Sequence, residues 1–141
     1  MKREVGKVTE EITLINAGDR RDASRGCVPE SGVRQVTVEA GADTGASTLV
    51  IGEELRQKLG LMIEDPRRTL FANGVRAECG VTEPVLIRWK DRDRACRAVV
   101  IPGGEQILLG AIPLEDMDLP VDPARRCLVG AHGDVVEALA L

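Results

Sequence analysis

One segment of the chain, Asp43-Thr44-Gly45-Ala46-Ser47, constrains the fold more than any other. It follows the alternating run 36–40, which has the period of two that a half-buried β-strand shows. An aspartate on a tight Thr-Gly turn at the end of a strand can point its carboxylate into a cleft while nearby backbone N–H groups bind that carboxylate. The simpler alternative is an aspartate that only caps the turn. The segment predicts a strand over residues 33–40 that leads into an aspartate-bearing turn.

The composition narrows the class of protein. At 141 residues the chain is long enough for one ordinary core, and we expect a single domain over residues 1–141. Charged residues make up 30% and the net charge is −4, with both signs interspersed, whereas a nucleic-acid-binding protein would show a basic patch or stripe. Phe71 and Trp89 are the only aromatic residues, so base-stacking platforms are not expected. The core has to come from Val, Leu, Ile and Ala.

Cysteine and histidine usage excludes several chemistries. The four cysteines are widely spaced without a Cys-x-x-Cys pair, so they do not resemble a zinc or iron–sulfur site. The start of the chain lacks the apolar region of a signal peptide, and free thiols in a reducing cytoplasm are expected. The only histidine is His132, near the end of the sequence, so a mechanism that needs a Ser-His-Asp or Cys-His arrangement is not expected. No apolar stretch approaches the length of a membrane span. We expect a cytoplasmic protein that binds no metal, no nucleic acid and no membrane.

Short strands dominate the predicted secondary structure. Alternation over residues 8–14 predicts a first strand that ends at the turn signal Asn16-Ala17-Gly18-Asp19. Residues 19–32 are charged and small and are predicted to form an exposed loop. The one clear helical segment covers residues 52–60, with glutamates at its start, two leucines four apart and a glycine at its end.

Two hairpins and two short strands complete the pattern. Asn73-Gly74 lies between two strand-like runs and is a strong hairpin signal, because a type I′ turn requires positive φ at both central residues. A second hairpin is predicted over residues 85–101, with its turn at 90–93. A fully apolar run at 107–109 predicts a buried strand, and 126–129 predicts a last strand.

This order of elements resembles the retropepsin-like aspartic proteases of clan AA, most closely the small single-domain bacterial and archaeal type. Residues 42–50 and 108–115 carry the resemblance, which runs from about 33 to 129. The first 32 residues are more weakly similar to the N-terminal hairpin of those proteins. The resemblance implies an all-β, closed barrel-like retropepsin (acid protease) fold with one or two short helices. The chain is expected to divide into an N-terminal strand and mobile loop (1–32), a protease core (33–129) and a tail (130–141).

The resemblance also implies a function. An aspartic endopeptidase hydrolyses a peptide or protein substrate with a water molecule activated between two carboxylates, and it uses no cofactor. Because this chain has one Asp-Thr-Gly segment, the pair has to come from Asp43 of each subunit of a homodimer. Two like carboxylates within hydrogen-bond distance cannot both ionise and therefore share one proton.

The family pattern assigns expected roles to residues around Asp43. The hydroxyl of Thr44 would bond to the partner subunit's backbone, and Gly45 would let amides approach the carboxylate, with Ala46 and Ser47 completing the loop. Each residue also has a purely structural explanation. The threonine could be present for its β-propensity, the glycine for the φ that the turn requires, and the serine as a surface hydroxyl. The resemblance also implies that Leu108, Leu109 and Gly110 form an element behind the loop and pack against it.

The Asn73-Gly74 hairpin falls where the family's flap lies. A flap closes over the substrate and supplies backbone hydrogen bonds to an extended peptide. An ordinary hairpin, with Phe71 packed inward, is the alternative. The expected substrate-binding residues of the flap are Phe71, Ala72, Asn73, Gly74 and Val75.

The chain departs from the family pattern at Gly41-Ala42, where members usually carry larger apolar residues before the aspartate. Glycine loosens a strand interior and can mark a bulge. This departure concerns how precisely the two carboxyl groups would be positioned. Two other hypotheses accompany the protease. One is a non-catalytic peptide-binding or scaffold protein on the same fold. The other is a monomeric β-barrel in which the turn motif is a coincidence.

Overall fold

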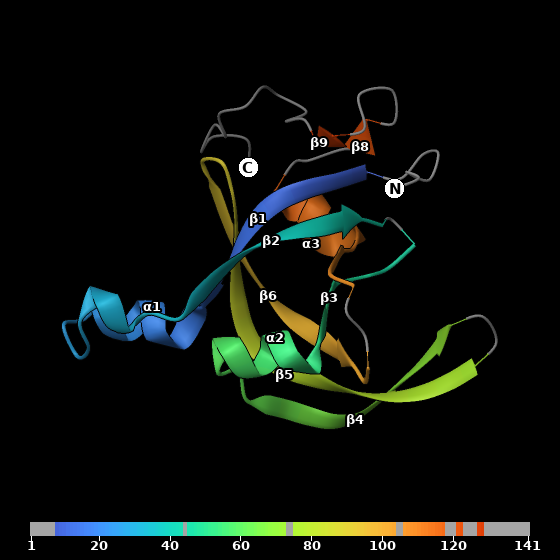
Figure 1. The fold of residues 1–141 in the computed structure, drawn as a ribbon, viewed down its shortest axis with the longest axis horizontal. Helices are drawn as coiled ribbons and strands as arrows, with labels where there is room; N and C mark the ends of the chain where they lie inside the picture. The colour runs from blue at the N-terminus through green and yellow to red at the C-terminus, as the bar shows by residue number, and fades with distance from the viewer. Residues whose placement is uncertain are drawn as a thin grey trace.

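The computed structural model describes residues 8–43, 45–72, 75–103, 106–117, 121–122 and 127–128 (Figure 1). These residues form a mostly β fold with three α-helices and one 3₁₀ helix. The strands are β1 Val8–Asn16, β2 Gln35–Ala42, β3 Leu49–Gly52, β4 Ile63–Ala72, β5 Val75–Trp89, β6 Arg92–Ile101, β7 Leu108–Leu109, β8 Val121–Asp122 and β9 Cys127–Leu128. The helices are α1 Ala17–Ser24, η1 Glu30–Gly32, α2 Glu53–Leu59 and α3 Ala111–Asp116.

Seven strands form one sheet in the order β1-β2-β7-β3-β6-β5-β4, and β1 also pairs with β5. β1 and β2 are antiparallel in an unbroken register from Val8 opposite Ala42 to Ile15 opposite Gln35. The last four residues of β1 also pair with residues 85–88 of β5. β1 therefore connects the strand that leads to Asp43 with the long strand that follows Asn73-Gly74.

The core is aliphatic, as the composition predicts. Val8, Ile12 and Leu14 on the inner face of β1 are buried, which confirms the predicted first strand. They pack with leucines and valines from β3, β5, β6 and β7. Trp89 is also fully buried in this core and lies within cation–π distance of Arg92.

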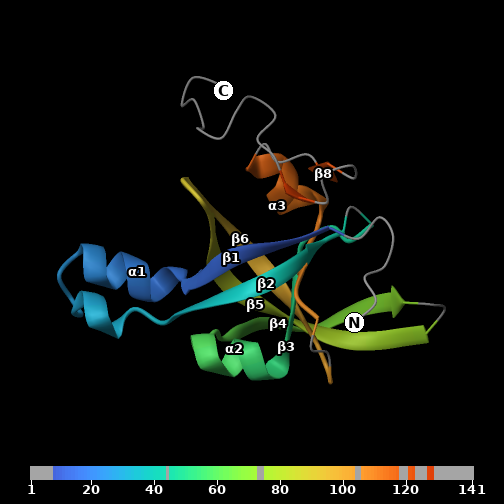
Figure 2. The same cartoon turned by 45° about the horizontal axis from the view of Figure 1, so that its top comes forward.

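The prediction of an exposed loop over residues 19–32 is wrong in its first part, because residues 17–24 form α1. The side chain of Asn16 accepts a hydrogen bond from the N–H of Asp19 and caps the helix, as asparagine at this position favours. The helix buries none of its residues, so its sequence carries no apolar period that would indicate a helix. Figures 1 and 2 show α1 extending away from the sheet.

The predicted helix over 52–60 is confirmed as α2, and Gly60 ends it with a left-handed φ of 64°. The first predicted hairpin is confirmed by the pairing of Ala72 with Val75, while residues 73–74 lie outside the described residues. The second hairpin has a tighter turn than predicted. Trp89 pairs directly with Arg92, which leaves a two-residue connection in which Lys90 has a φ of 52°. The predicted strands at 107–109 and 126–129 are confirmed by β7 and β9.

Asn16 joins three elements and gives a first test of the fold. Its buried side chain caps α1 and donates a hydrogen bond of 2.8 Å to the carbonyl of Leu59 at the end of α2. Replacement of Asn16 by alanine removes both bonds, and we expect the free energy of unfolding to fall by about 2 kcal/mol. Urea denaturation measures the loss. Ser24→Ala, which removes an exposed bond to Arg20, is the control and is expected to change stability by less than about 0.5 kcal/mol.

The ion pair between Asp19 and Arg34 predicts a pH dependence of stability. The hydrogen bond from the Arg34 guanidinium lowers the pKa of the Asp19 carboxyl from its ordinary value of 3.8. A carboxyl with a lowered pKa in the folded state stabilises the fold above its unfolded pKa, and this contribution disappears as the pH falls through the folded pKa. We therefore expect the loss of stability below about pH 4 to be shallower in Arg34→Gln than in wild type. Equal slopes in acid urea titrations of the two proteins would contradict this assignment.

Candidate active site

The backbone around Asp43 binds both its carboxylate and its main chain. The N–H of Gly45 donates a hydrogen bond of 2.9 Å to Oδ1 of Asp43. The N–H of Ala46 donates to the carbonyl of Asp43, which closes the turn. The N–H of Asp43 itself donates to the carbonyl of Leu109, 2.9 Å away. One oxygen of the carboxylate is thus bound by the backbone, while Asp43 remains exposed at the surface of the chain.

β7 lies between the two strands that flank the Asp43 loop. Leu108 and Leu109 pair in parallel with Gly41 and Ala42 of β2. The same two leucines pair antiparallel with β3, Leu109 opposite Leu49. A two-residue strand therefore fixes both ends of the loop, and the side chain of Leu109 is fully buried. Leu108 and Leu109 therefore lie behind the loop, at the position of the packing element that the family resemblance implies.

Gly110 lets the chain pass directly against the Asp43 loop. A Cβ at this position would lie 2.5 Å from both the N and the O of Thr48 and 2.7 Å from the O of Ala46, separations that real Cβ atoms do not show. The N–H groups of Gly110, Ala111 and Ile112 donate to the carbonyls of Thr48, Ala46 and Ser47 at 2.8–3.0 Å. The start of α3 thereby fixes the backbone that follows Asp43.

The ladder is unbroken at Gly41-Ala42, so the bulge that glycine can mark does not form there. Gly41 pairs with Thr9 of β1 on one side and with Leu108 of β7 on the other. Its N–H donates to the carbonyl of Ile107, and the residue is buried. Pairing on both sides compensates for the freedom of the glycine, and the strand carries Asp43 without a local irregularity.

The structure brings together Asp43, Gly45, Ala46 and Ser47 with Leu108, Leu109 and Gly110. Ser47 contributes its carbonyl, which binds α3, and its side chain is exposed. Thr44, Asn73 and Gly74 lie outside the described residues, as do the side chains of Phe71, Ala72 and Val75. The backbone of Phe71 and Ala72 lies in β4, opposite Arg76 and Val75 of β5.

Thr48 and Cys96 support the loop and were not assigned this role from the sequence. The hydroxyl of Thr48 donates to the carbonyl of Arg97, which ties the loop to β6. Cys96 lies beside Thr48 and Leu49, and burial raises the pKa of its thiol to about 11. Burial also raises the pKa of the Cys79 thiol. A raised pKa disfavours the thiolate, which is the nucleophilic form of cysteine.

Within the described ranges, no three His, Cys, Asp or Glu side chains form a group that could hold a metal ion. Among the helices of this described part, none has the length and apolar character needed to cross a membrane.

Fold and site together define a retropepsin-like structure, and solved structures agree with this class. EIAV protease complexed with the inhibitor HBY-793 is 23% identical, with a TM-score of 0.56, covering 78% of this chain and 86% of that one. The retroviral protease-like domain of Ddi1 from Leishmania major is 16% identical, with a TM-score of 0.54 and coverage of 95% and 98%. A retropepsin-like aspartic protease from Rickettsia conorii is 19% identical, with a TM-score of 0.50 and coverage of 86% and 91%. At these identities the likeness shows the fold.

The sequence shows the family. The chain belongs to the aspartyl protease family, whose model matches residues 30–111. This match includes the Asp43 loop, the β4–β5 hairpin and Gly110. A comparison with curated proteins finds no match.

Proposed function

We propose that the protein is an aspartic endopeptidase whose active site contains Asp43 from each subunit of a homodimer. One observation carries the proposal: an exposed carboxylate whose Oδ1 accepts the N–H of Gly45, on a loop that α3 fixes from behind. Membership of the aspartyl protease family supports the same chemistry. The sequence contains one Asp-Thr-Gly segment, so the site is complete only when two copies meet.

The geometry suggests how the pair acts. The bond from Gly45 fixes the orientation of one carboxylate oxygen and leaves the other free to face a second Asp43. The two carboxyl groups share one proton. The ionised group takes a proton from the bridging water, which attacks the peptide carbonyl, and the protonated group donates to the carbonyl oxygen. The amine then leaves with a proton.

We propose that the β4–β5 hairpin is the flap and that it binds substrate through the residues predicted around Asn73-Gly74. Both views of the ribbon show the outer end of this hairpin on the same side of the molecule as the connection from β2 to β3 (Figures 1 and 2). A hairpin in this place supplies backbone groups to an extended peptide and excludes water from the reaction. The substrate class is therefore an extended segment of an unfolded peptide or protein.

The pairing of β1 with both β2 and β5 supports the closed, barrel-like form of the fold. We propose one domain over residues 1–141, a reaction without metal or other cofactor, and a cytoplasmic location.

The direct test is degradation of an unfolded protein over a pH series, with and without a statine-type inhibitor. We expect cleavage that the inhibitor blocks and that a metal chelator leaves unchanged. Sedimentation under the same conditions is expected to show a dimer. Peptide binding without turnover from acid to neutral pH would favour the non-catalytic scaffold, and an inactive monomer would favour the coincidental motif.

A further inference from the structure

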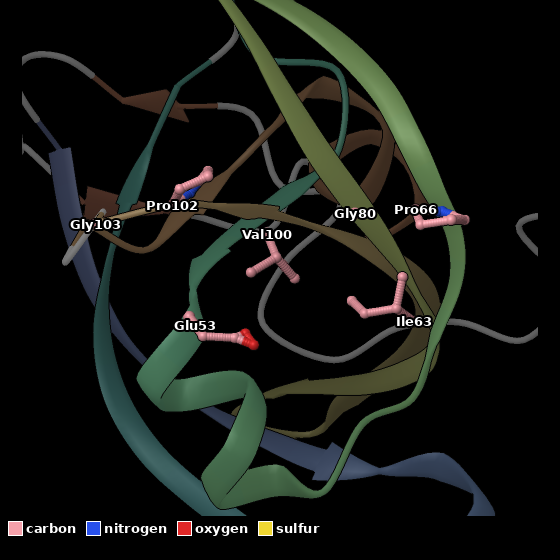
Figure 3. Close-up of a pocket in the computed structure, with 7 residues that line it drawn as sticks. All are labelled: Glu53, Ile63, Pro66, Gly80, Val100, Pro102 and Gly103. Carbon is pink, nitrogen blue, oxygen red and sulfur yellow. The ribbon is translucent and has the colours of Figure 1, made fainter.

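A cavity of about 460 Å³ lies at the base of the β4–β5 hairpin (Figure 3). Ile63, Pro66 and Gly80 line it from the hairpin, and Glu53, Val100 and the Pro102-Gly103 turn line it from α2 and β6. We call it the base cavity. Its lining residues belong neither to the Asp43 loop nor to residues 108–112, so it is a separate feature of the chain.

The base cavity lies where the hairpin ladder is irregular. The β4–β5 register shifts between Ile63 and Asp65 and again between Asp65 and Arg68. Beyond this point the pairing continues without a shift from Arg68 opposite Cys79 to the end of the hairpin. Shifts of this kind bend a strand and weaken the local ladder. The cavity therefore separates the regular outer hairpin from the strands and helix that surround the core.

Gly80 shapes one wall of the base cavity. A Cβ on this residue would lie 2.9 Å from Cδ1 of Ile63. The glycine therefore allows Ile63 to lie across β5, and the cavity forms next to this close approach.

The lining chemistry is apolar with one acidic group. Ile63, Pro66, Val100 and Pro102 provide apolar walls, and Glu53 is the one charged residue among the described side chains that line the cavity. Figure 3 shows the carboxylate of Glu53 directed into the space between α2 and β4. Its side chain is 42% exposed, so a ligand can reach it.

The carboxylate of Glu53 can accept hydrogen bonds from a second donor in addition to Arg56. Nε of Arg56 lies within hydrogen-bond distance of both its oxygens, 2.7 Å from Oε2. An ionised carboxylate accepts about four hydrogen bonds, so a ligand can donate further ones. The guanidinium of Arg56 also donates to the carbonyl of Leu61, which holds it against the end of α2. The cavity volume falls within the roughly 300–1,000 Å³ of ordinary small-molecule sites.

We propose that the base cavity binds a small molecule with an apolar body and a protonated amine, and that this ligand ties the β4–β5 hairpin to α2 and β6. The apolar walls take the body, and Glu53 pairs with the amine. A bound molecule touches both sides of the irregular ladder and so favours one position of the hairpin. The effect on proteolysis rests on the proposed function: if the hairpin is the flap, the ligand slows its opening and lowers turnover.

The binding test uses cyclohexylmethylamine as the probe and cyclohexylmethanol as its neutral counterpart. In amide NMR spectra of the full chain, we expect saturable shifts at Ile63, Gly80 and Val100. The amine is expected to bind roughly fivefold more tightly than the alcohol, as for a partly exposed ion pair. Glu53→Gln is expected to abolish this preference.

A matched control lies one residue away. Glu54 also has a partner on the same helix, Lys58, but does not line the cavity, so Glu54→Gln is expected to keep the preference. Shifts that do not saturate, shifts confined to the Asp43 loop, or an equal preference in Glu53→Gln would overturn the site. The dispersion of the amide signals in the same spectra also shows whether each variant is folded.

Hydrogen exchange tests the effect on the hairpin. We expect the amides of residues 68–72 and 75–79 to exchange several-fold more slowly with saturating amine, because local opening of the hairpin becomes less frequent. Unchanged exchange at saturation would overturn the coupling. None of these measurements requires proteolysis. An inactive protein that still binds the amine would therefore contradict the proposed function and leave the cavity site standing.

Discussion

Replacement of Asp43 by asparagine is expected to lower the rate of peptide hydrolysis on the order of 10³-fold or more. Asparagine has nearly the same shape, and its amide oxygen can still accept the N–H of Gly45. It cannot take a proton from water or donate one to the peptide carbonyl as the carboxyl pair does. Because both subunits of the proposed homodimer lose the carboxyl, no intact site remains. Initial rates on an unfolded protein substrate measure the effect.

The control for Asp43→Asn is Asp22→Asn in α1, which extends away from the sheet in both ribbon views. This variant is expected to keep wild-type activity. Circular dichroism and sedimentation are expected to show an unchanged fold and dimer for both variants, since Asp43 is exposed. If pure Asp43→Asn retained proteolytic activity, Asp43 would have no part in the reaction.

Replacement of Gly110 by alanine is expected to have the largest effect on stability. The added methyl group would lie 2.5 Å from backbone atoms of Thr48, and backbone cannot rotate away as a flexible side chain can. The Asp43 loop or α3 has to move, and the three bonds between them weaken. We expect a loss of about 3 kcal/mol in the free energy of unfolding, with activity lost as the loop shifts.

Urea denaturation measures this loss, and Gly32→Ala is the matched control. A Cβ at Gly32 would have its nearest neighbour at 3.7 Å, an ordinary contact with Pro29, so stability is expected to change by less than about 0.5 kcal/mol. A loss below about 1 kcal/mol in Gly110→Ala would mean that the close approach to Thr48 does not hold the loop.

Much of the fold could be predicted because its signals are local. The alternation before Asp43, the glutamates and glycine around α2, and Asn73-Gly74 each specify the backbone within a few residues. The resemblance carried by residues 42–50 and 108–115 then implied how these elements are arranged in the fold. The expected roles of Gly45 and Gly110 came from the same resemblance, and in the structure both glycines lie where backbone groups approach closely.

Other features depend on contacts between distant residues and leave no local trace. α1 has no buried face, so its stabilising contacts come from Asn16 and Arg34 rather than from an apolar period. The support from Thr48 requires the carbonyl of Arg97 on another strand. The base cavity exists only after β4, β6 and α2 are in place. Sequence patterns describe single elements, whereas these features arise between them.

Each active site is proposed to contain Asp43 from two different chains, and mixed dimers test this arrangement most directly. Wild type and Asp43→Asn are co-expressed or refolded together in equal amounts so that subunits pair at random, and the proteolytic rate is compared with that of pure wild type. Only dimers of two wild-type chains carry both carboxyl groups, so the rate is predicted to fall to about one quarter. A rate of about one half would contradict the account, because each wild-type chain would then carry a complete site of its own.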